Sequence, residues 1–155
     1  MKKELLDWVE TQTEKNMTFR IGCLDHVRSE ANTTLSILLA GAGACFVLAI
    51  NNWGEDCRLV TALIGTTVYL FSIGGVLVLK ALLLADVLPP TNEPKNLYQP
   101  EAKLDEIREA EIWNAQERIT AMTRVGNQAG NWLNFVRMAA VVTPLIFLLI
   151  WWVSA

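Results

Sequence analysis

Charged residues are scarce in this chain, and they are missing altogether from three long stretches. Of the 155 residues, 52% are hydrophobic and only 19% are charged. No charge falls in the 24 residues between Glu30 and Glu55, in the 21 between Arg58 and Lys80, or in the 18 that follow Arg137. Uncharged apolar runs of this length are typical of membrane-spanning helices. They exclude an intrinsically disordered chain and argue against a compact soluble enzyme.

Residues that carry chemistry are equally few. The one histidine, His26, lies beside Asp25 on a polar stretch and is interpreted as a surface residue. The cysteines Cys23, Cys45 and Cys57 fall at different predicted depths, so no disulfide is expected, and no zinc-ligand spacing is present. We therefore expect no catalytic residue, no metal site and no cofactor. A net charge of −3 without a basic cluster predicts that the chain does not bind a nucleic acid duplex.

The alternation of polar and apolar stretches predicts an all-α membrane protein with three transmembrane helices and long cytoplasmic helical extensions. The amino terminus turns acidic after Met1-Lys2-Lys3 instead of becoming apolar, so it is not expected to be a signal peptide. The expected order is a cytoplasmic amphipathic helix at 1–30, a two-span transmembrane hairpin at 31–87, a proline-rich linker at 88–100, a cytoplasmic helix at 101–137 and a third transmembrane helix at 138–155.

Apolar residues at spacings of three and four predict the faces on which the polar helices are buried. On the first helix these residues are Leu5, Leu6, Val9, Met17, Ile21, Leu24 and Val27. On the second they form a heptad seam that can pack against another helix or a second copy of the chain: Ala115, Ile119, Met122, Gly126, Ala129, Leu133 and Val136. Pro100 suits the first turn of the second helix, and Pro144 predicts a kink in the third span.

Small residues in the spans mark places where helices can approach closely, either within one chain or between copies. The candidate helix-packing positions are Ser36, Ala40, Gly41, Gly43, Ala44 and Gly65. Five arginines on the polar helices form a candidate ligand-binding set that could hold a cytoplasmic anion: Arg20, Arg28, Arg108, Arg118 and Arg124. The alternative is that these arginines pair with the many carboxylates of the same helices, which is their usual fate.

The distribution of Lys and Arg predicts the orientation in the membrane. The amino-terminal arm carries five (Lys2, Lys3, Lys15, Arg20, Arg28), and the segment after the second span carries six (Lys95, Lys103, Arg108, Arg118, Arg124, Arg137). The short loop between the first two spans carries one, Arg58, and the carboxy terminus none. Because basic residues are retained in the cytoplasm, we expect a multi-pass membrane protein with its amino terminus inside and its carboxy terminus outside.

The order of elements resembles the small transmembrane effectors of bacterial anti-phage defence, in particular the Pycsar-type effector membrane domain. The residues that carry this resemblance are the polar helix 28–36 running into the first span, Leu88-Pro89-Pro90, the segment 94–98, Arg118-Ile119 and Asn131-Trp132-Leu133. The resemblance covers most of the chain. It departs from the family's acidic and basic residues beside the first and last spans, whose places are taken here by Arg28, Glu30 and Asn131.

This resemblance implies a protein of the bacterial inner membrane, with its amino terminus in the cytoplasm and its carboxy terminus in the periplasm. It further implies that the protein oligomerises and impairs the bilayer when a cytoplasmic signal triggers it. The implied partners are the lipid bilayer, further copies of the chain, and a cyclic nucleotide or a partner protein as the trigger. Two alternatives stay open: a membrane scaffold or anchor that binds a cytoplasmic partner through the heptad seam, and a holin-like phage protein.

Overall fold

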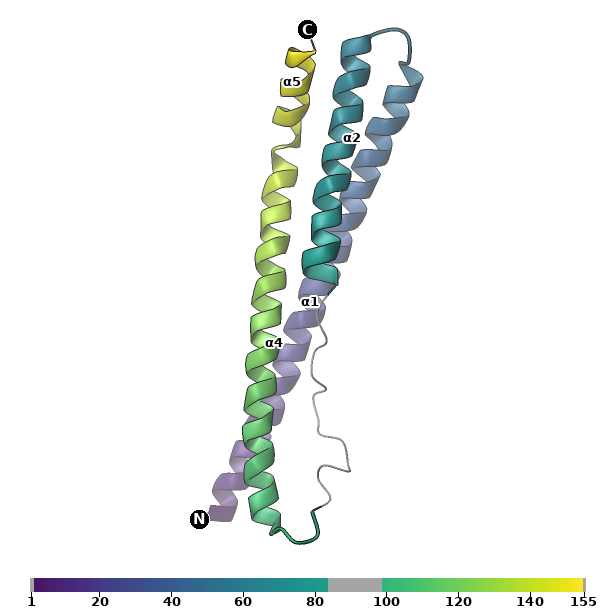
Figure 1. The fold of residues 1–155 in the computed structure, drawn as a ribbon. Coiled ribbons are helices and arrows are strands. Elements are labelled where there is room, and N and C mark those ends of the chain that lie inside the picture. Colours follow the sequence, from purple (N-terminus) through teal and green to yellow (C-terminus); the bar gives the residue numbers. More distant parts are fainter. Residues whose placement is uncertain (1, 84–98, 155) are drawn as a thin grey trace. The chain divides into compact units, whose positions relative to one another are not determined.

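A computed structural model describes residues 2–83 and 99–154, and within these ranges the chain is helical and contains no β-strand (Figure 1). The expected all-α fold is therefore confirmed. Of the predicted proline-rich linker, 88–98 lies outside the described residues, as does 84–87 at the end of the predicted hairpin. The elements are α1 (Lys2–Asn51), α2 (Cys57–Leu77), the π-helix η1 (Val78–Leu82), α4 (Leu104–Val141) and α5 (Thr143–Val153).

The described helices form two compact units. We call the first the polar unit, which comprises residues 2–26 and 99–127, and the second the apolar unit, which comprises 27–83 and 128–154. α1 and α4 each contribute residues to both units. As the lack of an internal proline predicts, α1 is one uninterrupted helix of 50 residues.

The polar unit is built on the heptad seam predicted from the sequence. Ala115, Ile119 and Met122 of α4 are buried against Met17 of α1, with Ile21 and Leu24 beside them. A Cβ atom added at Gly126 would lie 3.2 Å from the Leu24 Cδ2 atom. The absence of a side chain at Gly126 therefore leaves room for Leu24 to pack against α4. Contacts that begin at Asp7 with Arg108 and end at Leu24 with Gly126 show that α1 and α4 run parallel here.

Two details of the predicted polar helices are wrong. Leu5, assigned to the buried face of α1, is 60% exposed, whereas its neighbour Leu6 is 6% exposed, because successive residues point about 100° apart around a helix. α4 begins at Leu104 instead of Glu101, and Pro100 lies in the turn before it. The Glu106 carboxylate accepts a hydrogen bond from the Lys103 N–H at 3.4 Å, as in a capping box, which explains the later start.

The apolar unit contains an antiparallel pair formed by α1 and α2. The turn between them uses a positive φ at Gly54, and the Asp56 carboxylate caps α2 by accepting from the Arg58 and Leu59 N–H groups. Leu70 packs over Gly41, and the Thr67 hydroxyl lies 3.4 Å from the Ala42 carbonyl oxygen while it also bonds to its own helix. Small residues therefore set the separation of these two helices.

The outer surface of the apolar unit consists largely of exposed apolar side chains. Trp152 is 75% exposed and Ile37 67%, and both belong to long stretches without charge. Exposed apolar surface on this scale is typical of surfaces that meet a membrane or another protein. Two helices, α1 and α2 continued by η1, are long and apolar enough to cross a membrane, and the bent pair α4 and α5 makes a third if it counts as one span.

α5 packs very closely on α2 at Gly65. A Cβ atom at this position would lie 2.7 Å from the Ile150 Cδ1 atom and 3.4 Å from its Cγ2 atom. Gly65, a candidate helix-packing position in the sequence, is thus a residue whose missing side chain is filled by a neighbouring helix. A Cβ atom added at Gly75, ten residues further along α2, would have nothing within 4 Å.

Replacing Gly65 with leucine is expected to lower the melting temperature of the purified protein in detergent, because the new side chain and Ile150 compete for one space. Overpacking of this kind costs about 1–3 kcal/mol. Gly75→Leu is the matched control on the same helix, and combining Gly65→Leu with Ile150→Ala should recover part of the loss. Equal melting temperatures for Gly65→Leu and Gly75→Leu would contradict the close contact.

Candidate functional site

The last helical stretch of the chain is broken inside its apolar run. α4 ends at Val141 and α5 begins at Thr143, and their axes differ by 46°. Pro144 stands in the first turn of α5. It has no N–H, so the Ala140 carbonyl, four residues earlier, loses its usual helical donor. The kink predicted from Pro144 is present.

Tyr69 of α2 supplies a hydrogen bond at this break. Its hydroxyl donates to the Ala139 carbonyl oxygen at 2.8 Å, and the Val142 N–H donates to the same oxygen at 3.1 Å. The other hydroxyls of α2, such as those of Thr66 and Ser72, donate to their own helix four residues back. The tyrosine ring is too long for that, so its hydroxyl ties the broken helix to its neighbour.

The Thr143 hydroxyl beside the break is buried and has no hydrogen-bond partner in the described part of the chain. A buried polar group left without a partner costs about 1–3 kcal/mol. We call Tyr69, Ala139, Thr143 and Pro144 the bend site. It combines a helix break, an interhelical hydrogen bond and one unsatisfied hydroxyl.

A second polar contact joins α1 to α4 where both helices pass from charged to uncharged sequence. The Arg137 guanidinium donates to the Glu30 carboxylate, and its Nε atom lies 3.3 Å from the Thr34 Oγ1 atom. Glu30 is the last charge before one apolar run and Arg137 the last before another. The two charges that flank these runs thus compensate each other.

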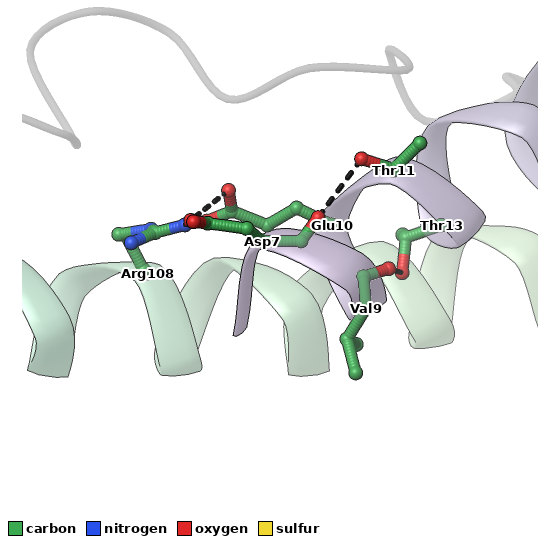
Figure 2. Close-up of polar contacts among 6 residues, drawn as sticks. All are labelled: Asp7, Val9, Glu10, Thr11, Thr13 and Arg108. Atoms are coloured by element: carbon green, nitrogen blue, oxygen red, sulfur yellow. Dashed lines mark hydrogen bonds and ion pairs between the residues drawn. The ribbon is translucent and has the colours of Figure 1, made fainter. Parts of the chain in front are cut away.

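In the polar unit, Arg108 of α4 is held by two carboxylates of α1 (Figure 2). Its Nε and Nη2 atoms donate to the two oxygens of Glu10 at 2.6 and 2.7 Å, and Nη2 also donates to Asp7. This bidentate hydrogen bonding lowers the pKa of Glu10 below 4.5, although burial opposes the shift, and it raises the pKa of Arg108.

Two of the five candidate ligand-binding arginines are paired with carboxylates. Arg108 is bound by Glu10 and Asp7, and the buried Arg118 donates to Glu111 at 2.9 Å. Arg28 belongs to the apolar unit, and the other four belong to the polar unit. Arg20 lies half-buried with its Nε atom lacking a partner among the described residues, and Arg124 is exposed. The alternative of carboxylate pairing holds for Arg108 and Arg118.

The candidate helix-packing residues divide into two groups. Gly41 and Gly65 contact Leu70 and Ile150 of neighbouring helices. Four others lie on the exposed face of α1: Ser36, Ala40, Gly43 and Ala44. The residues of α1 buried in the apolar unit are instead Ala31, Thr34, Leu38, Ala42 and Ala49. Packing within one chain therefore accounts for the first group and not for the second.

The heptad seam of α4 is occupied within the chain itself. Ala115, Ile119 and Met122 are covered by Met17, and Ala129, Leu133 and Val136 are also buried. A partner protein could reach this seam only if the covering helix moved away. The seam therefore does not offer the free surface on which the scaffold alternative was based.

The histidine and the cysteines take part in none of these contacts in the described part of the chain. His26 is exposed on α1, and Cys23, Cys45 and Cys57 are free thiols. Within residues 2–83 and 99–154, no group of three or more His, Cys, Asp or Glu side chains could hold a metal ion. Sequence reasoning missed the partners of Tyr69 and of Arg137. The bond of Tyr69 could have been expected from the sequence. Unlike the Thr and Ser side chains of the same helix, a tyrosine hydroxyl cannot reach its own backbone and must find a partner elsewhere.

The fold and its contacts define the class of this chain: an all-α protein with two or three apolar helices long enough to cross a membrane. Comparison with protein-family models, with curated proteins and with solved structures finds no match to it. Its function is therefore inferred from its residues and their arrangement.

The Arg108 contacts predict a pH-dependent stability of the polar unit. Because the pKa of Glu10 is lowered from 4.5 in the folded chain, the stabilisation is complete above that ordinary value and is lost as the pH falls through the lowered one. The melting temperature of wild type should exceed that of Arg108→Gln at neutral pH, and the difference should shrink as the pH falls below 4.5. Arg124→Gln is the control for the loss of one exposed charge; a difference that stays constant with pH would contradict the pairing.

Proposed function

We propose that this chain is an inner-membrane effector of bacterial anti-phage defence, which self-associates and impairs the membrane when it is triggered from the cytoplasm. The observation that carries the proposal is the exposed apolar surface of the apolar unit combined with the bend site. Exposed apolar helices suit a bilayer, and a hinged span suits a protein that changes state. The resemblance in the order of elements points to the same class.

The proposed topology places three spans in the membrane, with the third made by the bent pair α4 and α5. The helix directions support it: in the apolar unit α2 runs opposite to α1 and opposite to the bent pair α4 and α5. Three successive spans must alternate in this way. The excess of Lys and Arg on the amino-terminal arm and after α2 favours a cytoplasmic polar unit and a periplasmic carboxy terminus.

Self-association is proposed through the exposed face of α1. Ser36, Ala40, Gly43 and Ala44 line this face, and a Cβ atom at Gly43 would have nothing within 4 Å. In hydrocarbon a helix gains no hydrophobic free energy from association, so close contact between small residues is a main source of attraction. The Ser36 hydroxyl donates to its own backbone at 3.0 Å and leaves the face without an unmet donor.

Triggering is proposed to change the population of bent and straightened forms of the third span. A trigger shifts such an equilibrium only by the difference in its affinity for the two forms. Tyr69 stabilises the bent form through the Ala139 carbonyl, whereas the unpartnered Thr143 hydroxyl disfavours it. These opposing contributions allow the two forms to differ by little free energy.

The topology is tested by labelling single cysteines in cells whose outer membrane has been permeabilised. Cys57, exposed at the start of α2, should react with a membrane-impermeant maleimide in a Cys23→Ser, Cys45→Ser variant. Cys23, exposed on α1, should react only after lysis in a Cys45→Ser, Cys57→Ser variant. The reverse pattern would invert the orientation, and labelling of both before lysis would contradict the membrane insertion.

The activity is tested by membrane potential and dye uptake in bacteria that express the chain, with and without phage infection. We expect depolarisation on infection, and we expect Ala40→Leu combined with Ala44→Leu to abolish it because the larger side chains separate the copies. Gly75→Leu, which enlarges an exposed position on α2, is the control and should retain activity. A membrane that stays polarised under every condition would overturn the proposal, and full activity of the alanine double variant would overturn the α1 interface.

A further inference from the structure

Lys80 is the one charged residue between Arg58 and Asp86, and it stands where α2 changes its winding. Residues Val78–Leu82 form the π-helix η1, closed by a hydrogen bond of 2.8 Å from the Leu83 N–H to the Val78 carbonyl. This π-turn directly follows the last residue of α2, a place where such turns occur. Lys80 is exposed, and so are the apolar side chains of Leu79 and Leu83 on either side of it.

The ammonium of Lys80 faces an aromatic side chain of another helix. Its Nζ atom lies 6.0 Å from the centre of the Trp132 ring of α4, at the outer limit of a cation–π contact. Trp132 is half-buried and meets Phe135 edge-on, with ring centres 5.7 Å apart and an angle of 85° between the planes. Phe135 in turn is exposed. A lysine from η1 and an aromatic pair from α4 thus meet at the surface of the apolar unit.

The surface of this cluster therefore combines one cation, an indole and, next to Lys80, exposed leucines. A free phosphate ion would make no use of the apolar part. An amphipathic anion that carries a phosphate and long apolar chains would use both.

We propose that Lys80 and Trp132 form a binding site for the phosphate group of an anionic glycerophospholipid, with its acyl chains lying along Leu79, Leu83 and Phe135. The lysine ammonium has three N–H donors, and the aromatic face takes one side of it, so donors remain for phosphate oxygens. Lysine and tryptophan are the side chains that settle where a bilayer meets water. In the proposed topology this site faces the cytoplasmic leaflet.

The site requires only that the chain is inserted in a membrane and does not depend on the proposed effector function. A failure of the lipid test would leave the depolarisation experiment unaffected, and the reverse also holds. The headgroup charge decides which lipid should bind. Phosphatidylglycerol has no positive charge in its headgroup, whereas the choline of phosphatidylcholine competes with Lys80 for the phosphate, so phosphatidylglycerol should be preferred.

The test uses the purified full-length chain in detergent, titrated with phosphatidylglycerol, phosphatidylcholine or glycerol 3-phosphate, with bound lipid counted by native mass spectrometry. Wild type should retain phosphatidylglycerol in preference to phosphatidylcholine and should not bind glycerol 3-phosphate. Lys80→Gln should weaken phosphatidylglycerol binding about tenfold, as expected for the loss of one charge-assisted hydrogen bond. Lys80→Arg and Arg58→Gln should both bind as wild type does.

Arg58→Gln is the matched control because it also removes one positive charge from α2, at the opposite end of the helix. Equal weakening by Arg58→Gln and Lys80→Gln would overturn the site in favour of general charge attraction. Binding of glycerol 3-phosphate as strong as that of the lipid would overturn the lipid identity. Melting temperatures of all variants confirm that each is folded, and Trp132→Phe should weaken lipid binding even if Lys80 stays in place.

Discussion

Backbone hydrogen bonding within each helix is the constraint on which the rest of this structure depends. In an apolar surrounding, no water is present to meet an open carbonyl or N–H group, so each apolar run must form a continuous helix. Even the hydroxyls of Thr34, Ser36 and Thr66 bond to carbonyls of their own helix. At Pro144 the chain cannot obey this rule, because this residue offers no N–H to the Ala140 carbonyl. At the neighbouring Ala139 carbonyl, the Tyr69 hydroxyl adds a hydrogen bond from α2 to the one made by the Val142 N–H. The bend site is therefore a place where one helix is tied to its neighbour.

The two units obtain their cohesion in different ways. The polar unit buries a small apolar seam around Met17 and Ile119 and adds the hydrogen bonds of Arg108 to Glu10. The apolar unit relies on close contact at positions without large side chains, as where Ile150 lies over Gly65. Lipid can cover the surface of the apolar unit, and water can cover that of the polar unit. This division suits the proposed effector, which would receive its signal in the cytoplasm and act in the membrane.

Much of the fold could be predicted from the sequence, and the reasons are local. The break between α4 and α5 follows from Pro144, and the buried face of α4 follows from a spacing of three and four that the structure reproduces from Ala115 to Val136. The predicted burial was wrong where a shift of one residue along the helix decides which side chain faces the core, as at Leu5. The candidate site was less predictable, because an arginine such as Arg108 is charged in any context and its sequence position does not say which carboxylate it will meet.

The sequence by itself determined that the chain is helical and apolar enough for a membrane, because these properties depend on residues within one or two turns of each other. It also determined where the last helix bends, because Pro144 removes a donor wherever it stands. Only the tertiary structure decided that Tyr69 bonds to Ala139, that α1 covers the seam of α4, and that Ser36 and Ala40 stay exposed while Ala42 is buried. These outcomes depend on which face of one helix meets another, and side chains distant in sequence set that rotation jointly.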